Sequence, residues 1–166
     1  MNLMFAGLID QRAYDLYVET WHEHKGDTIR VEGPNGRPRV GCTILLAIAP
    51  TEKEALDVAR RGMDGLTRRA HNAHRYDHLV LPEDECDAAL APLRGILSHM
   101  EEAVAAGAGT PDQIAERFAR ILESGLTDYI VLQLPTGDMT FDEARRTLDL
   151  FVSDVKPQLE QASLAG

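Results

Sequence analysis

The segment from 109 to 157 constrains the fold more than any other part of the chain. Its residues predict a helix, a strand, a loop and a second helix, in that order. Thr110 and Gln113 form a capping box at the start of the first helix, and Pro111 occupies a position where its missing N–H costs nothing. Gly125 is placed to end this helix in the left-handed conformation. A helix–strand–helix unit of this kind is typical of parallel α/β proteins.

The predicted strand of this segment, residues 129–132, is apolar at every position. Such a run without alternation is typical of a strand that is buried on both faces. The polar loop 135–138 follows, and Thr140 with Glu143 forms a second capping box. The helix behind this box carries its apolar residues on one face: Ala144, Leu148, Phe151 and Val155.

A second apolar strand is predicted at 40–49, with the sequence VGCTILLAIA. Thr51 and Glu54 then form a third capping box, which indicates that another helix starts there. Further helical patterns cover 8–25 and 83–106, the latter with a kink or a break at Pro92. The residues between 26 and 38 are rich in Gly, Pro and Asn and predict a loop or a short hairpin.

These motifs together resemble the C-terminal end of luciferase-like flavin-dependent monooxygenases. In that family the pattern G-T-P-x-x-(I/V)-A-E-R precedes the last barrel strand, and GTPDQIAER stands here at 109–117. The family's closing helix is matched at ten positions, which are Glu143, Ala144, Arg146, Thr147, Leu148, Leu150, Phe151, Asp154, Val155 and Pro157. The strand at 40–49 and the sequence APTEKEA after it resemble the second-last strand and its helix, with Pro50 in place of an acidic residue.

The resemblance implies an α/β fold, namely the C-terminal part of a (β/α)8 TIM barrel with about two parallel strands and an α-helical insertion. A complete barrel takes ~250 residues, and the 166 residues of this chain do not supply eight strands. We therefore expect one domain, 1–166. Its expected sections are 1–36 (helix and loop), 37–62 (strand and helix), 63–108 (helical insertion), 109–157 (closing helix–strand–helix unit) and 158–166 (tail).

The resemblance also implies a function, that of a flavin-dependent oxidoreductase or monooxygenase. FMN would be the cofactor, and reduced flavin and dioxygen would act on an unknown organic substrate. The chain would be a truncated or split form whose partner is an N-terminal half-barrel. The alternative is a non-catalytic, homo-oligomeric remnant of the family, because the edges of two apolar strands must be paired or covered.

Candidate site residues follow the two predicted strands, because ligands of such barrels bind at the carboxyl ends of the strands. Gln133 and Thr136 could hydrogen-bond flavin or substrate, and Gly137 would let a backbone approach closely. The same residues also fit an ordinary turn before a helix. In the insertion, His74 and Tyr76 are candidates for lining the pocket. No catalytic residue is assigned, because in the family the phosphate and the acid/base groups are held by earlier strands.

Three histidines, His71, His74 and His78, follow the spacing i, i+3, i+7. On a continuous helix they would share one face and could bind a divalent metal, which makes a metal-binding module the third hypothesis. Solvated histidines at a helix end are the competing interpretation. No cysteine or carboxylate stands at a spacing that would complete a zinc site, and we predict no metal.

The net charge of −10, from 17 basic and 27 acidic residues, disfavours nucleic acid and anionic membranes as partners. No apolar run approaches the ~20 residues that a membrane-spanning helix needs. The N-terminus lacks the basic and apolar regions of a signal peptide. Cys42 and Cys86 fit neither a disulfide framework nor a zinc spacing, so a cytoplasmic location is expected.

Overall fold

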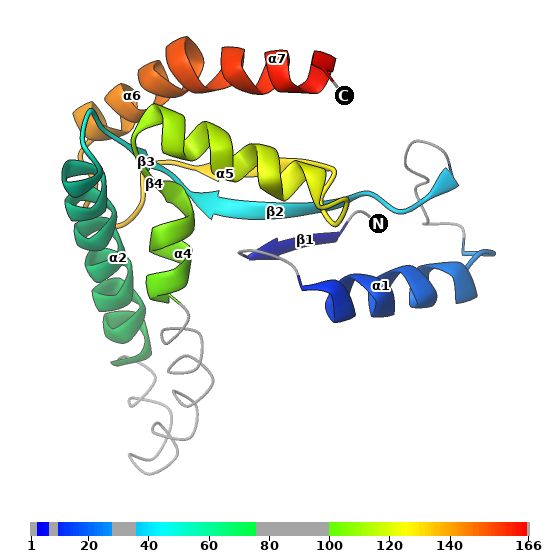
Figure 1. Cartoon of the computed structure of the whole chain (residues 1–166). Coiled ribbons are helices and arrows are strands. Elements are labelled where there is room, and N and C mark those ends of the chain that lie inside the picture. The colour runs from blue at the N-terminus through cyan, green and yellow to red at the C-terminus, as the bar shows by residue number, and fades with distance from the viewer. Residues whose placement is uncertain (1–2, 7–9, 28–35, 76–99, 166) are drawn as a thin grey trace.

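The computed structural model of the chain describes residues 3–6, 10–27, 36–75 and 100–165. Its centre is a three-stranded parallel sheet in the order β1 (Leu3–Ala6), β2 (Val40–Leu45), β5 (Tyr129–Gln133), shown in Figure 1. In its register Cys42 of β2 lies between Phe5 of β1 and Ile130 of β5. Beyond the end of β2 a short parallel pair joins β3 (Ala47–Ile48) to β4 (Ala108–Gly109).

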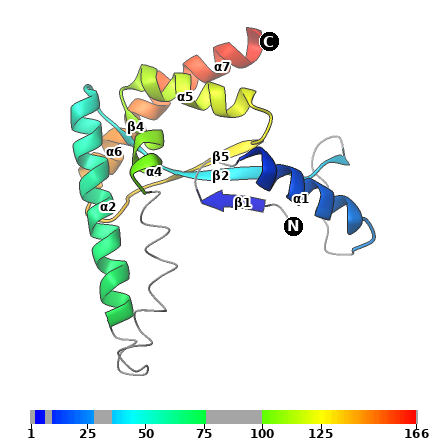
Figure 2. The same ribbon diagram turned by 60° about the horizontal axis from the view of Figure 1, so that its bottom comes forward.

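The helices surround this sheet mainly on one side and at the carboxyl ends of its strands. They are α1 (Gln11–Glu23), α2 (Glu52–Arg75), α4 (Met100–Gly107), α5 (Pro111–Glu123), α6 (Phe141–Leu150), the π-helix η3 (Phe151–Val155) and α7 (Lys156–Ala165). In both Figure 1 and Figure 2, α5 and α7 lie together on the same side of β2, while α2 stands where β2 ends.

Two of the three predicted capping boxes, at Thr110 and Thr140, have both of their hydrogen bonds. Thr110 and Thr140 each accept a hydrogen bond from the third residue of their helix, whose side chain accepts one in return from the capping N–H. Thr51 accepts from the N–H of Glu54 at 3.3 Å. Gly125, with φ at +72°, confirms the predicted left-handed end of α5. Local sequence therefore determines where these helices begin and end.

The main hydrophobic core lies between one face of the sheet and the helices α5, η3 and α7. Every second residue of β2 points into it, because side chains alternate across a strand. Its buried members are Cys42, Ile44, Leu46, Ile48, Ile114, Ala115, Phe118 and Val155, and Ile130 and Leu132 of β5 pack against them. This face of the sheet is covered, as expected for an α/β layer.

The other face of the sheet, which we call the open face, carries Thr43 and Leu45 of β2 beside Val131 and Gln133 of β5. Thr43 and Leu45 are half-buried and Gln133 is exposed, while Val131 is 37% exposed. The prediction that the strand at 129–132 is buried on both faces is therefore wrong. β5 is an edge strand of the described sheet, and an apolar sequence does not reveal whether a neighbour is present.

Several predicted section bounds differ from the structure. The section 1–36, expected as helix and loop, also contains the strand β1, whose four residues are too short for a periodic signal. The expected tail, 158–166, is helical through Ala165, because the wide turn of η3 leads the chain past Pro157 without ending the helix. The strand predicted at 40–49 is interrupted at Leu46, and α2 runs without a break through position 62.

The described residues thus form a helix-rich α/β fold with few parallel strands and no closed barrel. Both outer strands, β1 and β5, are edges of the described sheet. Membership of a TIM barrel remains a prediction. Within the described ranges, no helix has both the length and the apolar character to cross a membrane.

Candidate functional site

The carboxyl ends of β2 and β5 lie at the same edge of the sheet. The predicted site residues Gln133, Thr136 and Gly137 lie at this edge or in the loop that follows it. The N–H of Leu46 donates to the carbonyl of Gln133 at 3.4 Å, which holds the two strand ends together. The side chain of Gln133 is exposed on the open face at this edge. Gln133 is therefore the predicted site residue that the structure leaves accessible to a ligand.

Gly137 allows a close approach, as predicted, but what approaches it is a helix of the same chain. It has φ at +52°, and a Cβ at this position would overlap the carbonyl of Gly62 in α2. Gly62 is equally constrained, because its own Cβ would lie 2.8 Å from the carbonyl oxygen of Thr136. The loop after β5 is therefore packed directly on the backbone of α2, and a side chain on either glycine would separate the two.

Thr136 is buried beneath this contact, and its hydroxyl has no hydrogen-bond partner among the described residues. It lines a cavity of about 10 Å³, which is room for roughly one water molecule. The other lining residues are mainly apolar: Leu45, Leu46, Ala47, Val58, Ala59, Gly62, Val104 and Met139. Small-molecule pockets usually measure ~300 Å³ or more, so this cavity is not a flavin site.

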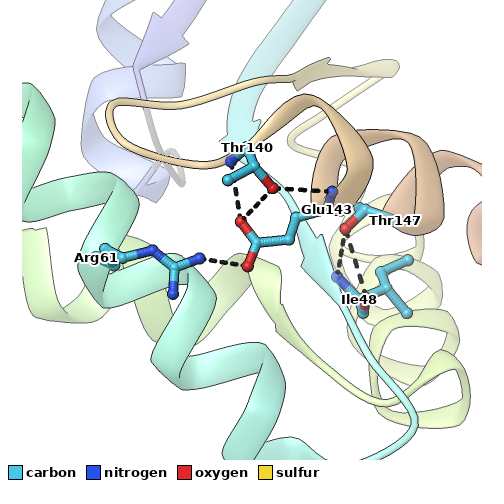
Figure 3. Close-up of polar contacts among 5 residues, drawn as sticks. All are labelled: Ile48, Arg61, Thr140, Glu143 and Thr147. Atoms are coloured by element: carbon cyan, nitrogen blue, oxygen red, sulfur yellow. Dashed lines mark hydrogen bonds and ion pairs between the residues drawn. The ribbon is translucent and has the colours of Figure 1, made fainter.

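Two polar contacts join α6 to the elements around the site, as Figure 3 shows. The buried hydroxyl of Thr147 accepts from the N–H of Ile48 at 3.2 Å and lies 3.4 Å from the carbonyl oxygen of that residue. Glu143 accepts from the N–H and the hydroxyl of Thr140, both at 2.9 Å, and forms an ion pair with Arg61 of α2. The first contact fixes α6 to β3, and the second fixes it to α2.

The pKa of Glu143 is lowered by these neighbours. Partial burial acts to raise it, but the hydrogen bonds from Arg61 and Thr140 and the positive charge of Arg61 outweigh that effect. Glu143 is therefore held as a carboxylate, and Arg61 is neutralised by it. The ion pair therefore stabilises the packing of α2 on α6, and the charge of Arg61 is already paired with a carboxylate of the same chain.

Comparison with protein-family models finds no match, and comparison with curated proteins finds none either. Among solved structures the chain is similar to the monooxygenase RslO1 from Streptomyces bottropensis, with a TM-score of 0.50 and 19% sequence identity. The match covers 95% of this chain and 41% of that one, so this chain spans about two fifths of the length of RslO1. At this identity the likeness establishes a shared fold alone.

The structure does not test the remaining candidates. His71 and His74 belong to α2, whereas Tyr76 and His78 lie outside the described residues. Among the residues that the structure describes, no group of three or more His, Cys, Asp or Glu side chains could hold a metal ion. Cys86 also lies outside them.

Cys42 is fully buried on the covered face of the sheet. Burial raises the pKa of its thiol, and a hydrogen bond with Thr127 opposes that shift only in part. A buried thiol with a raised pKa is a poor nucleophile. Cys42 is thus a core residue.

Sequence reasoning missed several residues that organise this edge. They are Gly62, Arg61, Thr147 in its polar role, and Gly65, where a Cβ would lie 2.4 Å from the side chain of Asp138. The two glycines stand one helical turn apart, a spacing that indicates close approach of another segment to one helix face. The partner of that face, and the pairing of Arg61 with Glu143 across 82 positions, depend on the tertiary fold.

Proposed function

We propose that this chain is a section of a luciferase-like flavin-dependent monooxygenase and forms one wall of its flavin and substrate site. Two observations support the proposal. The motifs between 109 and 157 form the expected helix–strand–helix unit, and the chain shares the fold of part of the monooxygenase RslO1. The observation that carries it is a parallel sheet whose helices cover one face, while on the other face, among the described residues, Val131 and Gln133 are exposed beside the strand ends.

The described residues at the carboxyl ends of β2 and β5 do not fit FMN by themselves. The cavity beside Thr136 is about 10 Å³, Gly137 is packed on α2, and Arg61 is neutralised by Glu143. Under the proposal, the groups that bind the flavin phosphate and transfer protons lie in other polypeptide segments. Thr43, Leu45 and Val131 provide a largely apolar wall, which excludes water from a site completed by those segments.

Gln133 is the residue of this wall that can bind a ligand directly. Its side-chain amide offers both a donor and an acceptor, as the flavin ring edge requires. It is exposed at the end of β5, and its backbone is fixed by the hydrogen bond to Leu46. We therefore assign it the positioning of the ring or of the substrate.

Titration of the purified chain with riboflavin and with FMN, followed by amide NMR, tests this function. We expect shifts at the amides of Thr43, Val131 and Gln133, and Gln133→Ala should abolish them. Gln158→Ala on α7 is the matched control, because Gln158 bonds Asp112 on the helical side of the molecule. The two flavins should bind alike, since Arg61 is engaged and the phosphate adds little.

Shifts confined to the covered face, or shifts that persist in Gln133→Ala, would refute the proposed wall. Much tighter binding of FMN than of riboflavin would show that this chain holds the phosphate itself, contrary to the proposal. No described residue cluster favours the metal-binding hypothesis.

A further inference from the structure

A pocket at the helical side of the sheet is separate from the carboxyl-end site. It measures about 340 Å³ and lies between the end of α4, the second half of α5 and the turn that leads into β5. Small-molecule sites usually measure ~300–1,000 Å³, so this pocket is large enough for an organic ligand. Leu126 and Thr127, which line it, precede β5, whereas Gln133 lies at the other end of this strand. The pocket therefore lies toward the amino ends of the strands.

Arg117 of α5 lines this pocket with a guanidinium group that the chain already holds in place. Its Nη1 donates to the carbonyl oxygens of Ala105 and Ala108, at 2.7 Å and 2.6 Å. These bonds engage the N–H groups of Nη1, which are two of the five that a guanidinium carries. Among the described residues, no carboxylate pairs with Arg117, and its Nε and Nη2 have no hydrogen-bond partner. Arg117 is thus a fixed positive charge with three N–H groups left for a ligand.

Arg120 lines the same pocket and adds a second positive charge. Its Nη1 lies 3.9 Å from Oε1 of Glu116, and the two side chains are 65% and 69% exposed. An exposed pair at this distance contributes little and is readily exchanged for another anion. Residues three apart share a helix face, so Arg117 and Arg120 can contact one ligand together. In a chain with a net charge of −10, two neighbouring cations without a strong carboxylate partner favour an anion from outside the chain.

The rest of the described lining is mainly apolar, and consists of Ala106, Ile121 and Leu126 beside the turn. The hydroxyl of Ser124 donates to the carbonyl of Ile121 at 2.6 Å and accepts from the N–H of Leu126 at 3.2 Å, so the turn itself engages it. A ligand in this pocket therefore meets guanidinium groups on one helix face and hydrocarbon elsewhere.

We propose that this pocket binds a small organic carboxylate. The carboxylate accepts a pair of hydrogen bonds from Nε and Nη2 of Arg117, which is the geometry in which arginine binds carboxylates most strongly. Arg120 supplies the second charge, and the apolar body of the ligand contacts Ile121 and Leu126. Inorganic phosphate has no such body and would leave the apolar lining without a contact.

Titration of the full chain with benzoate, followed by amide NMR, tests this proposal. We expect saturable shifts at the amides of Ile121, Leu126 and Thr127. Benzyl alcohol has the same ring without the charge, and inorganic phosphate has charge without the ring. Each of these two should bind at least about tenfold more weakly than benzoate, because each lacks one of the two kinds of contact.

Two arginine variants and one matched control locate the charge that matters. Arg120→Gln should weaken benzoate binding roughly fivefold, the usual upper size for an exposed ion pair. Arg145→Gln on α6 is the control, because Arg145 is 72% exposed and lies 3.9 Å from Asp149, so the same charge is lost elsewhere. Arg117→Lys keeps the charge but not the paired donors, and should weaken binding roughly tenfold or more. Because Arg117 also holds the end of α4, Arg120→Gln decides the outcome if Arg117→Lys does not fold.

Benzoate that causes no saturable shifts at these amides would overturn the proposal, as would equal affinity for benzyl alcohol or for phosphate. Equal affinities of Arg120→Gln and Arg145→Gln for benzoate would overturn it as well, because binding would then not depend on the charge at the pocket. The titration uses no flavin, and its reporter amides lie at the end of the sheet opposite Gln133. Its outcome is therefore independent of the proposed function.

Discussion

Two buried threonines differ in what their hydroxyls contact, and this difference predicts opposite effects of the same substitution. Thr147→Val leaves the N–H of Ile48 without its acceptor and should destabilise the protein by about 1–3 kcal/mol. Thr136→Val removes a hydroxyl that has no partner among the described residues and should be neutral or stabilising. Urea unfolding midpoints at constant m-value measure both effects.

Thr147→Ser and Thr136→Ser serve as controls, since each keeps the hydroxyl and loses a methyl group. If Thr136→Val were as destabilising as Thr147→Val, the Thr136 hydroxyl would have to be hydrogen-bonded, for instance to a water in the adjoining cavity. That result would contradict the expected difference between the two hydroxyls.

Gly137 should tolerate no side chain. Gly137→Ala adds left-handed strain and an overlap with the carbonyl of Gly62, together roughly 2–5 kcal/mol of destabilisation. Gly125→Ala is the matched control, because Gly125 has φ at +72° but no atom within 4 Å of the added methyl. It should cost about 1–2 kcal/mol from backbone strain alone. Equal losses in thermal or urea unfolding would contradict the close contact with α2.

For single residues, the sequence predicts that position 137 needs a glycine, but it does not identify the group that approaches this glycine. A positive φ and a close approach follow from the turn residues around it, whereas the identity of the approaching group does not. Gln133 is a similar case. The sequence predicts that it lies at the end of a strand, but its exposure depends on which strands are neighbours of β5 in the described sheet.

At the level of elements, the ion pair between Arg61 and Glu143 makes the contact of α2 with α6 dependent on pH. The folded-state pKa of Glu143 lies below its ordinary value of 4.5. The carboxylate therefore contributes stability that is fully present above that pH and is lost as pH falls through the lower folded-state pKa. Glu143→Gln keeps an acceptor for the cap but removes the charge, and should cost up to about 1 kcal/mol at neutral pH, the usual size of a partly exposed ion pair.

The difference between wild type and Glu143→Gln should shrink as the solution is acidified below this value. Arg61→Gln should show the same convergence, because it removes the charge that favours the carboxylate. Chemical unfolding at a series of pH values measures both. A difference that is constant with pH would mean that the carboxylate is not stabilised in the folded protein.

Helix starts were the most predictable elements, because Thr51, Thr110 and Thr140 each carry their capping partner three residues on. Strand neighbours were the least predictable. β1 is only four residues long, and β5 has the apolar composition of a central strand although it lies at an edge. Partners in a parallel sheet are distant along the chain, so local pattern does not contain them. The helix through 158–165 was missed because Pro157 usually marks a helix end.

The described residues together form a parallel α/β unit whose sheet has one face covered by helices and the other face partly exposed. The covered face explains the core and the buried Cys42. The open face, with Gln133 at its carboxyl edge, is what the proposed flavin site requires. The proposed function therefore depends on the assignment of faces along β2.

Thiol labelling of adjacent positions in β2 tests this assignment most directly. In a Cys86→Ser background, Cys42 should resist an alkylating reagent, because it is fully buried and its pKa is raised. A cysteine introduced by Thr43→Cys occupies the same strand but the open face, and should be modified while the protein is folded. Peptide mass spectrometry distinguishes the two sites. The predicted result is rapid modification of the cysteine at position 43 and protection of Cys42. Equal protection or equal reactivity of the two cysteines would contradict a sheet that is covered on one face and open on the other.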